Sequence, residues 1–280
     1  MILVTGATGN VGSELVSALA EAGEQVRALT RNPSAAALLP PGVEPVAGDL
    51  NRPQSLADAL AGVSGIFLLP GYQDMPGLLA EARQAGVKRV VLLSGGSAAL
   101  ADLDNAVSRY MTLSERAVRE SGLSWTFLRP RSFMSNALRW RPQLAVGDEV
   151  RVPFPSVRTA AIDPYDIAAV AVPALLTDDH DGRIHELTGP ESLLPADQVA
   201  VLAKVLGRDL HSHGLTDAEA REDMSRTMPA EYVDAFFSFF VDGTLDESST
   251  HPTVRDVTGR EPRTFEQWAR AHAGEFAVPA

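Results

Sequence analysis

Short apolar runs alternate, along the first half of the chain, with stretches in which apolar residues recur every three or four positions. The clearest runs are Ile2–Val4, Ile66–Leu69 and Arg89–Leu93. Between the first two, apolar residues from Val11 to Leu19 fall on one face of a helix. A run that is apolar throughout is typical of a strand buried on both faces. The alternation predicts βαβ units and therefore a doubly wound parallel sheet.

The rest of this half continues the alternation. We expect further strands at Gln25–Thr30, Val43–Ala47 and Trp125–Leu128, and helices at Gln54–Leu60, about 77–85 and about 105–121. Between the strand at Arg89–Leu93 and the helix at about 105–121, the Gly- and Ala-rich stretch 95–104 is expected to be a mobile lid or a plain surface loop.

The pattern changes near Pro130 and becomes more interrupted. We expect strands at Glu149–Val152 and Thr159–Ile162, and helices at Pro164–Leu176, Pro195–Leu206, Ala218–Met224, Glu231–Phe240 and Phe265–Ala273. This composition suits a smaller α+β cap over the carboxyl edge of the sheet. The predicted organisation is a nucleotide-binding domain over 1–135 and a substrate-binding part over 136–280, which can interleave.

The turn after the first apolar run, TGATGNVG, carries glycines at Gly6, Gly9 and Gly12. A helix N-terminus behind such a turn attracts anions, because its first N–H groups are free and its dipole is positive there. Gly6 and Gly9 let the backbone approach a pyrophosphate, and Gly12 lets the helix pack closely on the strand. The G-x-x-G-x-x-G spacing is a variant of the common dinucleotide motif. We therefore expect a Rossmann-type sheet that binds a dinucleotide.

The end of the second strand indicates which dinucleotide. NAD-binding proteins usually place a carboxylate there for the ribose 2′-hydroxyl. This chain has Thr30 and Arg31 instead. A guanidinium can grip a 2′-phosphate with two charge-assisted hydrogen bonds, so Arg31 predicts NADP(H) as the cofactor.

Other strand ends supply further candidates, because ligands of such sheets bind at the carboxyl edge. Asp49 and Leu50 follow the third strand and can meet adenine, although an Asp at this place is equally well explained as a turn residue. Leu69, Pro70 and Ser94 are expected beside the ribose and nicotinamide. The Ser94 hydroxyl is a candidate for orienting a substrate carbonyl.

Composition narrows the class of protein. The chain has 280 residues, a formal net charge of −12 and no cysteine. The charge argues against nucleic acid as a partner, and the absence of cysteine excludes disulfides and thiolate chemistry. A strand that begins at residue 2 and the lack of a long apolar run lead us to expect a cytoplasmic protein without a membrane partner. His211 and His213 share one strand face, as a metal pair could, but exposed strand histidines are common and we expect no metal site.

Carbonyl-reducing short-chain dehydrogenases use a Tyr-x-x-x-Lys pair, in which the lysine lowers the pKa of the tyrosine. The chain has four tyrosines, and none has a lysine four positions later. Only Lys88 and Lys204 are lysines, so no substitute lies nearby in sequence. The usual pair is absent, and Tyr110 is left as a candidate proton donor.

Four motifs together resemble the NmrA-like family of atypical short-chain dehydrogenases: the opening TGATGNVG, TRNP at 30–33, GDL at 48–50 and the segment 114–136. The stretch VTGREPRTFEQWARAHAGEF near the end extends the resemblance over nearly the whole chain. Members are NADPH-dependent quinone or related reductases, or redox sensors that bind the dinucleotide without turnover. The resemblance assigns the pyrophosphate to Gly6, Thr8, Gly9, Asn10, Val11 and Gly12, the 2′-phosphate to Arg31, adenine to Asp49 and Leu50, and the ribose–nicotinamide side to Leu69, Pro70 and Ser94.

Two departures from that family's pattern concern the substrate side. Arg131 stands where glycine often follows Leu-Arg-Pro, and Met111 stands four positions before Glu115, where many members have histidine or lysine. Glu115 itself is interpreted as structural, paired with an arginine.

The sequence thus predicts an NADPH-dependent, quinone-reductase-like enzyme that passes hydride to a quinone or conjugated aromatic ketone. Phe133 and Met134, together with the Phe-rich stretch 236–240, are expected to hold a flat ring, and Arg131 to line the substrate mouth. Catalysis is assigned to Tyr110 and Ser94. The alternative is a non-catalytic NADP(H) sensor, which the missing Tyr–Lys pair favours equally.

Overall fold

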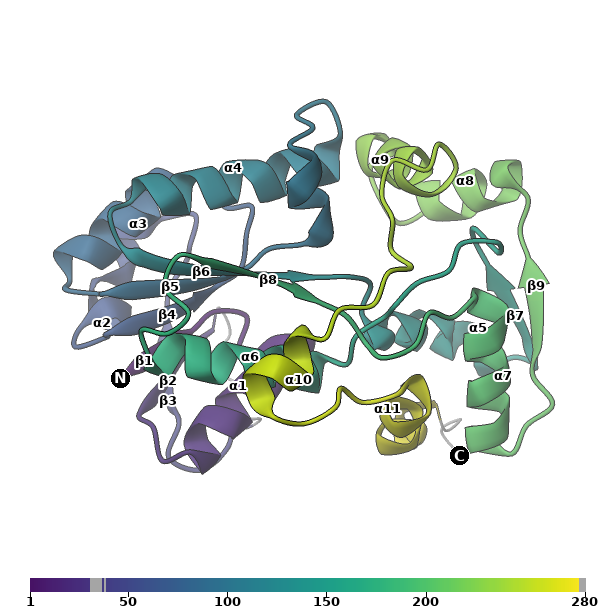
Figure 1. Ribbon diagram of the computed structural model, residues 1–280, viewed down its shortest axis with the longest axis horizontal. Coiled ribbons are helices and arrows are strands. Elements are labelled where there is room, and N and C mark those ends of the chain that lie inside the picture. Colours follow the sequence, from purple (N-terminus) through teal and green to yellow (C-terminus); the bar gives the residue numbers. More distant parts are fainter. Residues whose placement is uncertain (31–36, 38, 277–280) are drawn as a thin grey trace.

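The computed structural model describes residues 1–30, 37 and 39–276, and at its centre lies a seven-stranded parallel sheet (Figure 1). Along the sheet the order is β3-β2-β1-β4-β5-β6-β8, and each neighbouring pair is parallel. The strands are β1 (Ile2–Val4), β2 (Val26–Thr30), β3 (Glu44–Ala47), β4 (Gly65–Leu68), β5 (Arg89–Leu93), β6 (Ser124–Pro130) and β8 (Arg183–Leu187). The order reverses between β1 and β4, which opens a crevice at their carboxyl ends.

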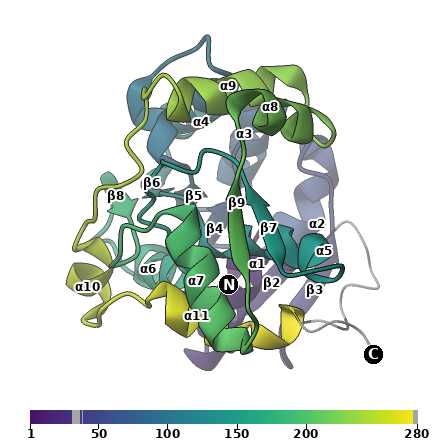
Figure 2. The same ribbon diagram turned by 90° about the vertical axis from the view of Figure 1, so that its right-hand side faces the viewer.

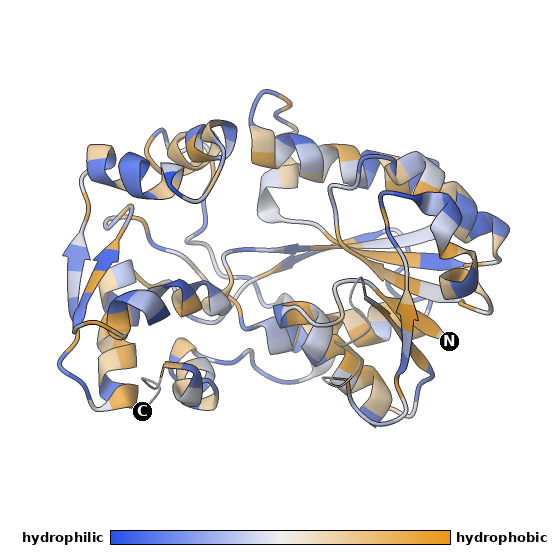
Figure 3. Ribbon diagram, turned by 180° about the vertical axis from the view of Figure 1, so that it is seen from behind, coloured by the Kyte–Doolittle hydropathy of each residue, from blue (hydrophilic) through white to orange (hydrophobic). Residues whose placement is uncertain are grey.

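Burial explains why the inner strands read as apolar runs. Every residue of β1 and β4 is buried, whereas the edge strand β3 is largely exposed. Pro45 occurs in β3, where an edge position tolerates the missing N–H. Hydrophobic residues accordingly concentrate in the sheet, while the flanking helices alternate in character (Figure 3).

Helices cover both faces of the sheet. One face carries α1 (Asn10–Glu21) and α6 (Pro164–Leu176), and the other carries α2 (Ala57–Leu60), α3 (Met75–Gln84) and α4 (Ala106–Glu120). Each layer closes over its own hydrophobic core. The fold is thus the predicted α/β, doubly wound, Rossmann-type arrangement.

A smaller part lies beyond the carboxyl ends of the strands and contains a two-stranded parallel sheet of β7 and β9 (Figure 2). Its elements are η4 (Met134–Trp140), α5 (Arg141–Leu144), β7 (Glu149–Val152), α7 (Pro195–Leu206), β9 (His211–Gly214), α8 (Asp217–Ser225), α9 (Ala230–Phe240), α11 (Phe265–Ala271) and η5 (Ala273–Phe276). Further short helices belong to the larger part of the molecule, which contains the seven-stranded sheet. They are η2 (Pro53–Leu56), η3 (Gly96–Leu100) and α10 (Thr253–Thr258).

The sequence ranges 1–135 and 136–280 interleave in space. Both β8 and α6 come from the second range, yet β8 pairs with β6 and α6 packs on α1 and the sheet. The expected strand at Thr159–Ile162 is wrong, because within it only isolated bridges form, Thr159 with Leu193 and Ile162 with Phe133. The expected loop 95–104 contains η3, which packs against α4.

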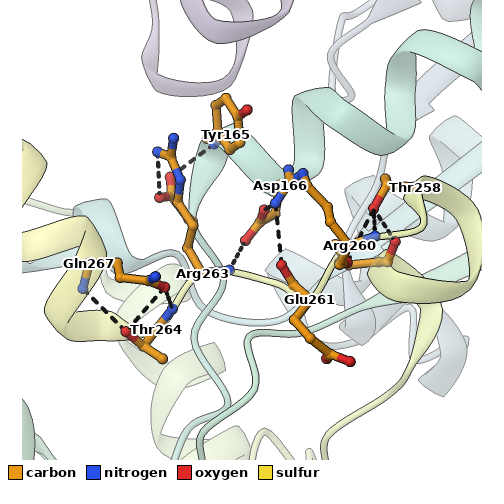
Figure 4. A network of polar contacts seen from close by, with 10 residues as sticks. Tyr165, Asp166, Thr258, Arg260, Glu261, Arg263, Thr264 and Gln267 are labelled. Atoms are coloured by element: carbon orange, nitrogen blue, oxygen red, sulfur yellow. Dashed lines mark hydrogen bonds and ion pairs between the residues drawn. The ribbon is translucent and has the colours of Figure 1, made fainter.

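A polar network fastens the C-terminal segment to the start of α6 (Figure 4). Asp166, fully buried, accepts a hydrogen bond from the Arg263 backbone N–H at 2.7 Å and pairs with the Arg260 guanidinium at 2.7 Å. The Arg263 guanidinium lies over the ring of Tyr165, 3.5 Å from its centroid. These contacts explain the stretch of charged residues that precedes α11, and they hold the smaller part against the sheet.

Candidate functional site

The turn between β1 and α1 requires glycine for measurable reasons. Gly6 has φ +62°, the left-handed region, and its carbonyl accepts a hydrogen bond from the Gly9 N–H at 2.9 Å. A Cβ on Gly12 would stand 2.1 Å from the Gly6 carbonyl oxygen, closer than any real contact. A Cβ on Gly6 would stand 2.6 Å from Leu69 Cδ1. The turn therefore folds back on the helix only without these side chains.

The start of α1 offers a site for an anion. Gly9 is its N-cap and supplies no side-chain cap, and the first turn contains no acidic residue. Thr8, Gly9 and Asn10 are exposed, while Val11 and Gly12 are buried against the turn. Free N–H groups at an exposed helix start fit a pyrophosphate. These residues suit the dinucleotide that the sequence predicts.

The ends of β1 and β4 are tied together beside this turn. Buried Thr5 accepts, on Oγ1, a hydrogen bond from the Leu69 N–H at 3.0 Å. Leu69 and Pro70 are half-buried at the crevice where the strand order reverses. Their position is the one expected for residues that flank a bound dinucleotide.

On the adenine side the structure describes Asp49 and Leu50, and Arg31 lies outside the described residues. Asp49 Oδ1 accepts from the Asn51 N–H at 3.0 Å, and Oδ2 lies 3.7 Å from Arg52 Nε. Asp49 therefore performs the turn role that its sequence position equally allowed. Leu50 is buried in the core beneath α2.

Ser94 is committed to a buried ion network, which corrects its predicted catalytic role. Its hydroxyl is buried and donates to Glu115 Oε1 at 2.7 Å, so the same proton is not available to a substrate carbonyl. Arg129 donates to both Glu115 oxygens at 2.8 Å, and Arg119 lies 3.2 Å from Oε2. The hydrogen bonds to Glu115 raise the pKa of Arg129. Glu115 is structural, as expected, and Ser94 completes its coordination.

Tyr110 lies on α4, between the loop after β4 and helix α9. A Cβ on Gly71 would stand 3.4 Å from Tyr110 Cδ2, and the Tyr232 ring centroid is 6.4 Å away. Burial raises the pKa of Tyr110, and the neighbouring Tyr232 adds to the rise. The phenol therefore keeps its proton near neutral pH and can donate it.

A cavity of about 1160 Å³ opens between η4, β7, α8 and α9. It adjoins the glycine turn, because the Asn10 side-chain amide donates to the Ser135 hydroxyl at 3.0 Å and the neighbours of Ser135 line the cavity. Aromatic residues form much of its wall: Phe133, Trp140, Phe154 and Phe240. The site can therefore hold a flat apolar molecule next to a bound dinucleotide.

Of the three predicted substrate residues, Phe133 lines this cavity and the other two do not. Met134 is buried in the core of the smaller part, so its assignment to the ring-binding wall is wrong. The Arg131 guanidinium lies against Gly96, because a Cβ added to Gly96 would stand 2.2 Å from Arg131 Nη1. Arg131 Nη2 also lies 3.9 Å from Glu186 Oε2. Arg131 thus fills the space that glycine leaves under η3 instead of facing the cavity.

Several cavity residues were missed in the sequence. Phe154 has φ +51°, a strained conformation for a large residue, and packs against Phe237 and Phe240 at 5.2 and 5.1 Å between ring centroids. Nothing in its sequence context, VPFPS, marks it as a wall residue. In the Phe-rich stretch 236–240, Phe240 lines the cavity and Phe237 packs in a hydrophobic core.

Among the described residues, no group of His, Asp and Glu side chains could hold a metal ion. Over the same residues, no helix has the length and apolar character needed to span a membrane.

The fold and the glycine turn define a dinucleotide-binding protein, and comparison with known proteins refines that class. Residues 6–178 match the model of a family described as NAD(P)H-binding. A (4-alkanoyl-5-oxo-2,5-dihydrofuran-3-yl)methyl phosphate reductase of Streptomyces griseus is 40% identical over 99% of both chains. An NAD(P)H azoreductase of Xenophilus azovorans is 37% identical over 99% of this chain and its own whole length.

Solved structures share the fold. An NADPH-dependent quinone oxidoreductase of Escherichia coli has a TM-score of 0.80 at 23% identity, over 98% of this chain and 100% of its own. NmrA, a negative transcriptional regulator, has a TM-score of 0.73 at 20% identity, over 96% and 94%. The chain belongs to the NAD(P)H-binding family and is an NAD(P)H-dependent reductase.

Proposed function

We propose that the protein transfers hydride from NADPH to a conjugated acceptor, a quinone or a conjugated aromatic ketone, held in the cavity beside the glycine turn. One observation carries the proposal. An aromatic-lined cavity of about 1160 Å³ adjoins the dinucleotide site in a chain that has no Tyr-x-x-x-Lys pair.

The missing pair selects the kind of acceptor. Hydride addition to a simple ketone leaves a strongly basic alkoxide, which needs a positioned acid. Hydride addition to a quinone leaves a delocalised phenolate, and a proton from water then gives the hydroquinone while the oxidised dinucleotide departs. Two electrons and one hydrogen come from the dinucleotide and one proton from water. A site without a strong acid therefore suits the second reaction.

The acceptors in the names of related proteins support this choice. They are an azo compound, a quinone and an alkanoyl-substituted oxo-dihydrofuran. Each carries its reducible bond in conjugation, so the charge that hydride brings can spread over several atoms.

The chain's own residues divide the work of binding. NADPH supplies the hydride, and the N–H groups at the start of α1 hold its pyrophosphate, with Gly6, Gly9 and Gly12 giving it room. Leu69 and Pro70 flank its ribose–nicotinamide side, with Ser94 fixing the end of β5 through Glu115. Asp49 shapes the turn on the adenine side, and Leu50 packs in the core beneath it.

Arg31 sets the preference for NADPH over NADH in this proposal. It follows β2 directly, where a carboxylate would favour the 2′-hydroxyl of NADH. A guanidinium there gives the 2′-phosphate a charged, bidentate partner.

Phe133 and the other aromatic wall residues hold the acceptor ring and exclude water from one side of it. Tyr110, with its raised pKa, is the candidate donor for acceptors that need a proton from the protein. It does not line the cavity, so reduction of quinones does not depend on it.

The test is oxidation of NADPH in the presence of matched acceptors. We expect steady turnover with 1,2-naphthoquinone and none with simple ketones such as cyclohexanone. Turnover with the simple ketones and none with quinones would overturn the proposal. Binding of NADPH without turnover of any acceptor would favour a redox sensor, the second candidate, which the missing Tyr–Lys pair supports.

A further inference from the structure

One cation in the cavity differs from its neighbours. Arg139 lines the cavity near the end of η4, and no described residue pairs with or hydrogen-bonds to its guanidinium. The other lining arginines are paired, Arg151 with Asp223 at 3.4 Å and Arg226 with Glu222 at 2.7 Å. An arginine without a counter-charge in a concave site is typical of an anion-binding position.

The electrostatics of the cavity reinforce this. Its described lining contains three arginines against one aspartate, although the whole chain carries a formal charge of −12. Arg139 lines the cavity and is solvent-exposed, and desolvation by the surrounding protein lowers its pKa. Low-dielectric walls around excess positive charge focus the field on an incoming anion.

Position links Arg139 to the proposed reaction. Ser135, four residues earlier in η4, bonds to Asn10 at the dinucleotide site. With a rise of about 2 Å per residue in a 3₁₀-helix, Arg139 lies about 8 Å farther along the axis. The aromatic residues Phe133 and Trp140 line the cavity from the two ends of this helix.

We infer that Arg139 forms an anion subsite at the distal end of the acceptor cavity, which binds an oxyanion group, such as a phosphate ester or a sulfonate, on a flat conjugated acceptor. The inference rests on the proposed function for its placement of the acceptor. The aromatic walls hold the ring, and the guanidinium fork holds two oxygens of the anionic group. The subsite therefore selects charged over neutral acceptors.

A binding experiment tests the subsite without turnover. Titration calorimetry in the presence of NADP⁺ compares 2-naphthyl phosphate with 2-naphthol. We expect the phosphate to bind at least about tenfold more tightly, the order of one charge-assisted hydrogen bond, and Arg139→Gln to abolish that advantage. Equal affinity of the two ligands, or an advantage that survives in Arg139→Gln, would overturn the inference.

Matched variants separate charge from folding. Arg255→Gln removes an exposed arginine of α10, outside the cavity, and is expected to leave both affinities unchanged. Arg139→Lys keeps the positive charge but loses the bidentate guanidinium. We therefore expect it to retain part of the affinity advantage of 2-naphthyl phosphate over 2-naphthol. If Arg139→Gln does not fold, the salt dependence of ligand binding to the wild-type protein still tests the subsite. Raising the salt concentration must weaken the phosphate and spare the naphthol, and equal sensitivity would contradict a charged subsite.

Kinetics with 1,2-naphthoquinone and its 4-sulfonate connect the subsite to turnover. We expect the sulfonate to have the lower KM in the wild type and the two KM values to converge in Arg139→Gln, with kcat for the neutral quinone unchanged. If binding depends on Arg139 but neither quinone is reduced, the subsite is supported and the proposed function is wrong. If both quinones are reduced with equal KM, the proposed function is supported and the subsite is wrong.

Discussion

Gly12 is a residue whose replacement the backbone geometry strongly constrains. An added Cβ would meet the backbone of Gly6 and Ala7, which cannot rotate away as a side chain could. We expect Gly12→Ala to lose dinucleotide binding and about 1–3 kcal/mol of stability through overpacking. Thermal unfolding with and without NADPH measures both. Gly147→Ala is the control, because nothing lies within 4 Å of its added Cβ. A stable, NADPH-binding Gly12→Ala protein would show that the close turn is not required.

Some single-residue roles could be predicted from the sequence, and others depend on contacts that only the fold creates. The glycine spacing was readable because backbone geometry leaves few alternatives at those positions. The role of Ser94 was not, since its partner Glu115 lies 21 positions away on α4. Met134 and Arg131 were misplaced for a similar reason. An apolar residue after a strand can face core or cavity, and Arg131 turns toward Gly96 only because of the fold around it.

Among the elements, periodicity predicted helices α6 and α7 and strand β7 with their observed bounds. Strand β8, Arg183–Leu187, was missed because its sequence, RIHEL, lacks an apolar run and it lies at the sheet edge with one side free. Edge strands carry a weak hydrophobic pattern, so sequence alone did not reveal that the second half returns to complete the sheet.

This edge strand contributes a pH dependence of stability. His185 in β8 lies 3.0 Å from His180, Nε2 to Nδ1, and burial with the nearby His180 lowers the pKa of His185 to about 4. The folded state therefore binds fewer protons than the unfolded state between about pH 6.5 and 4. Stability is present above that window and is lost as the pH falls through it.

We expect this group to remove about 1–2 kcal/mol of unfolding free energy between pH 7 and 4, a figure reduced for its partial exposure. His185→Gln should flatten the slope in denaturant titrations across that range. His211→Gln, whose side chain is exposed, should leave it unchanged. An identical slope in His185→Gln would mean that the acid loss originates elsewhere.

On the scale of the whole molecule, the proposed cofactor and acceptor sites lie where the sheet and the smaller part meet. The strand order reverses between β1 and β4, and the cavity opens next to the glycine turn through the contact of Asn10 with Ser135. Although the protein is acidic overall, both ligand sites in this account recognise negative charge. We propose that helix N–H groups and Arg31 bind the cofactor and that Arg139 binds the acceptor.

Equilibrium binding of the two reduced dinucleotides tests the central claim most directly. Calorimetry with NADPH and NADH should show NADPH bound at least about tenfold more tightly, the order of a charge-assisted contact to its extra phosphate. Arg31→Ser should bring the two dissociation constants together. If neither dinucleotide binds, or NADH binds as tightly as NADPH to the unmodified protein, the account is contradicted.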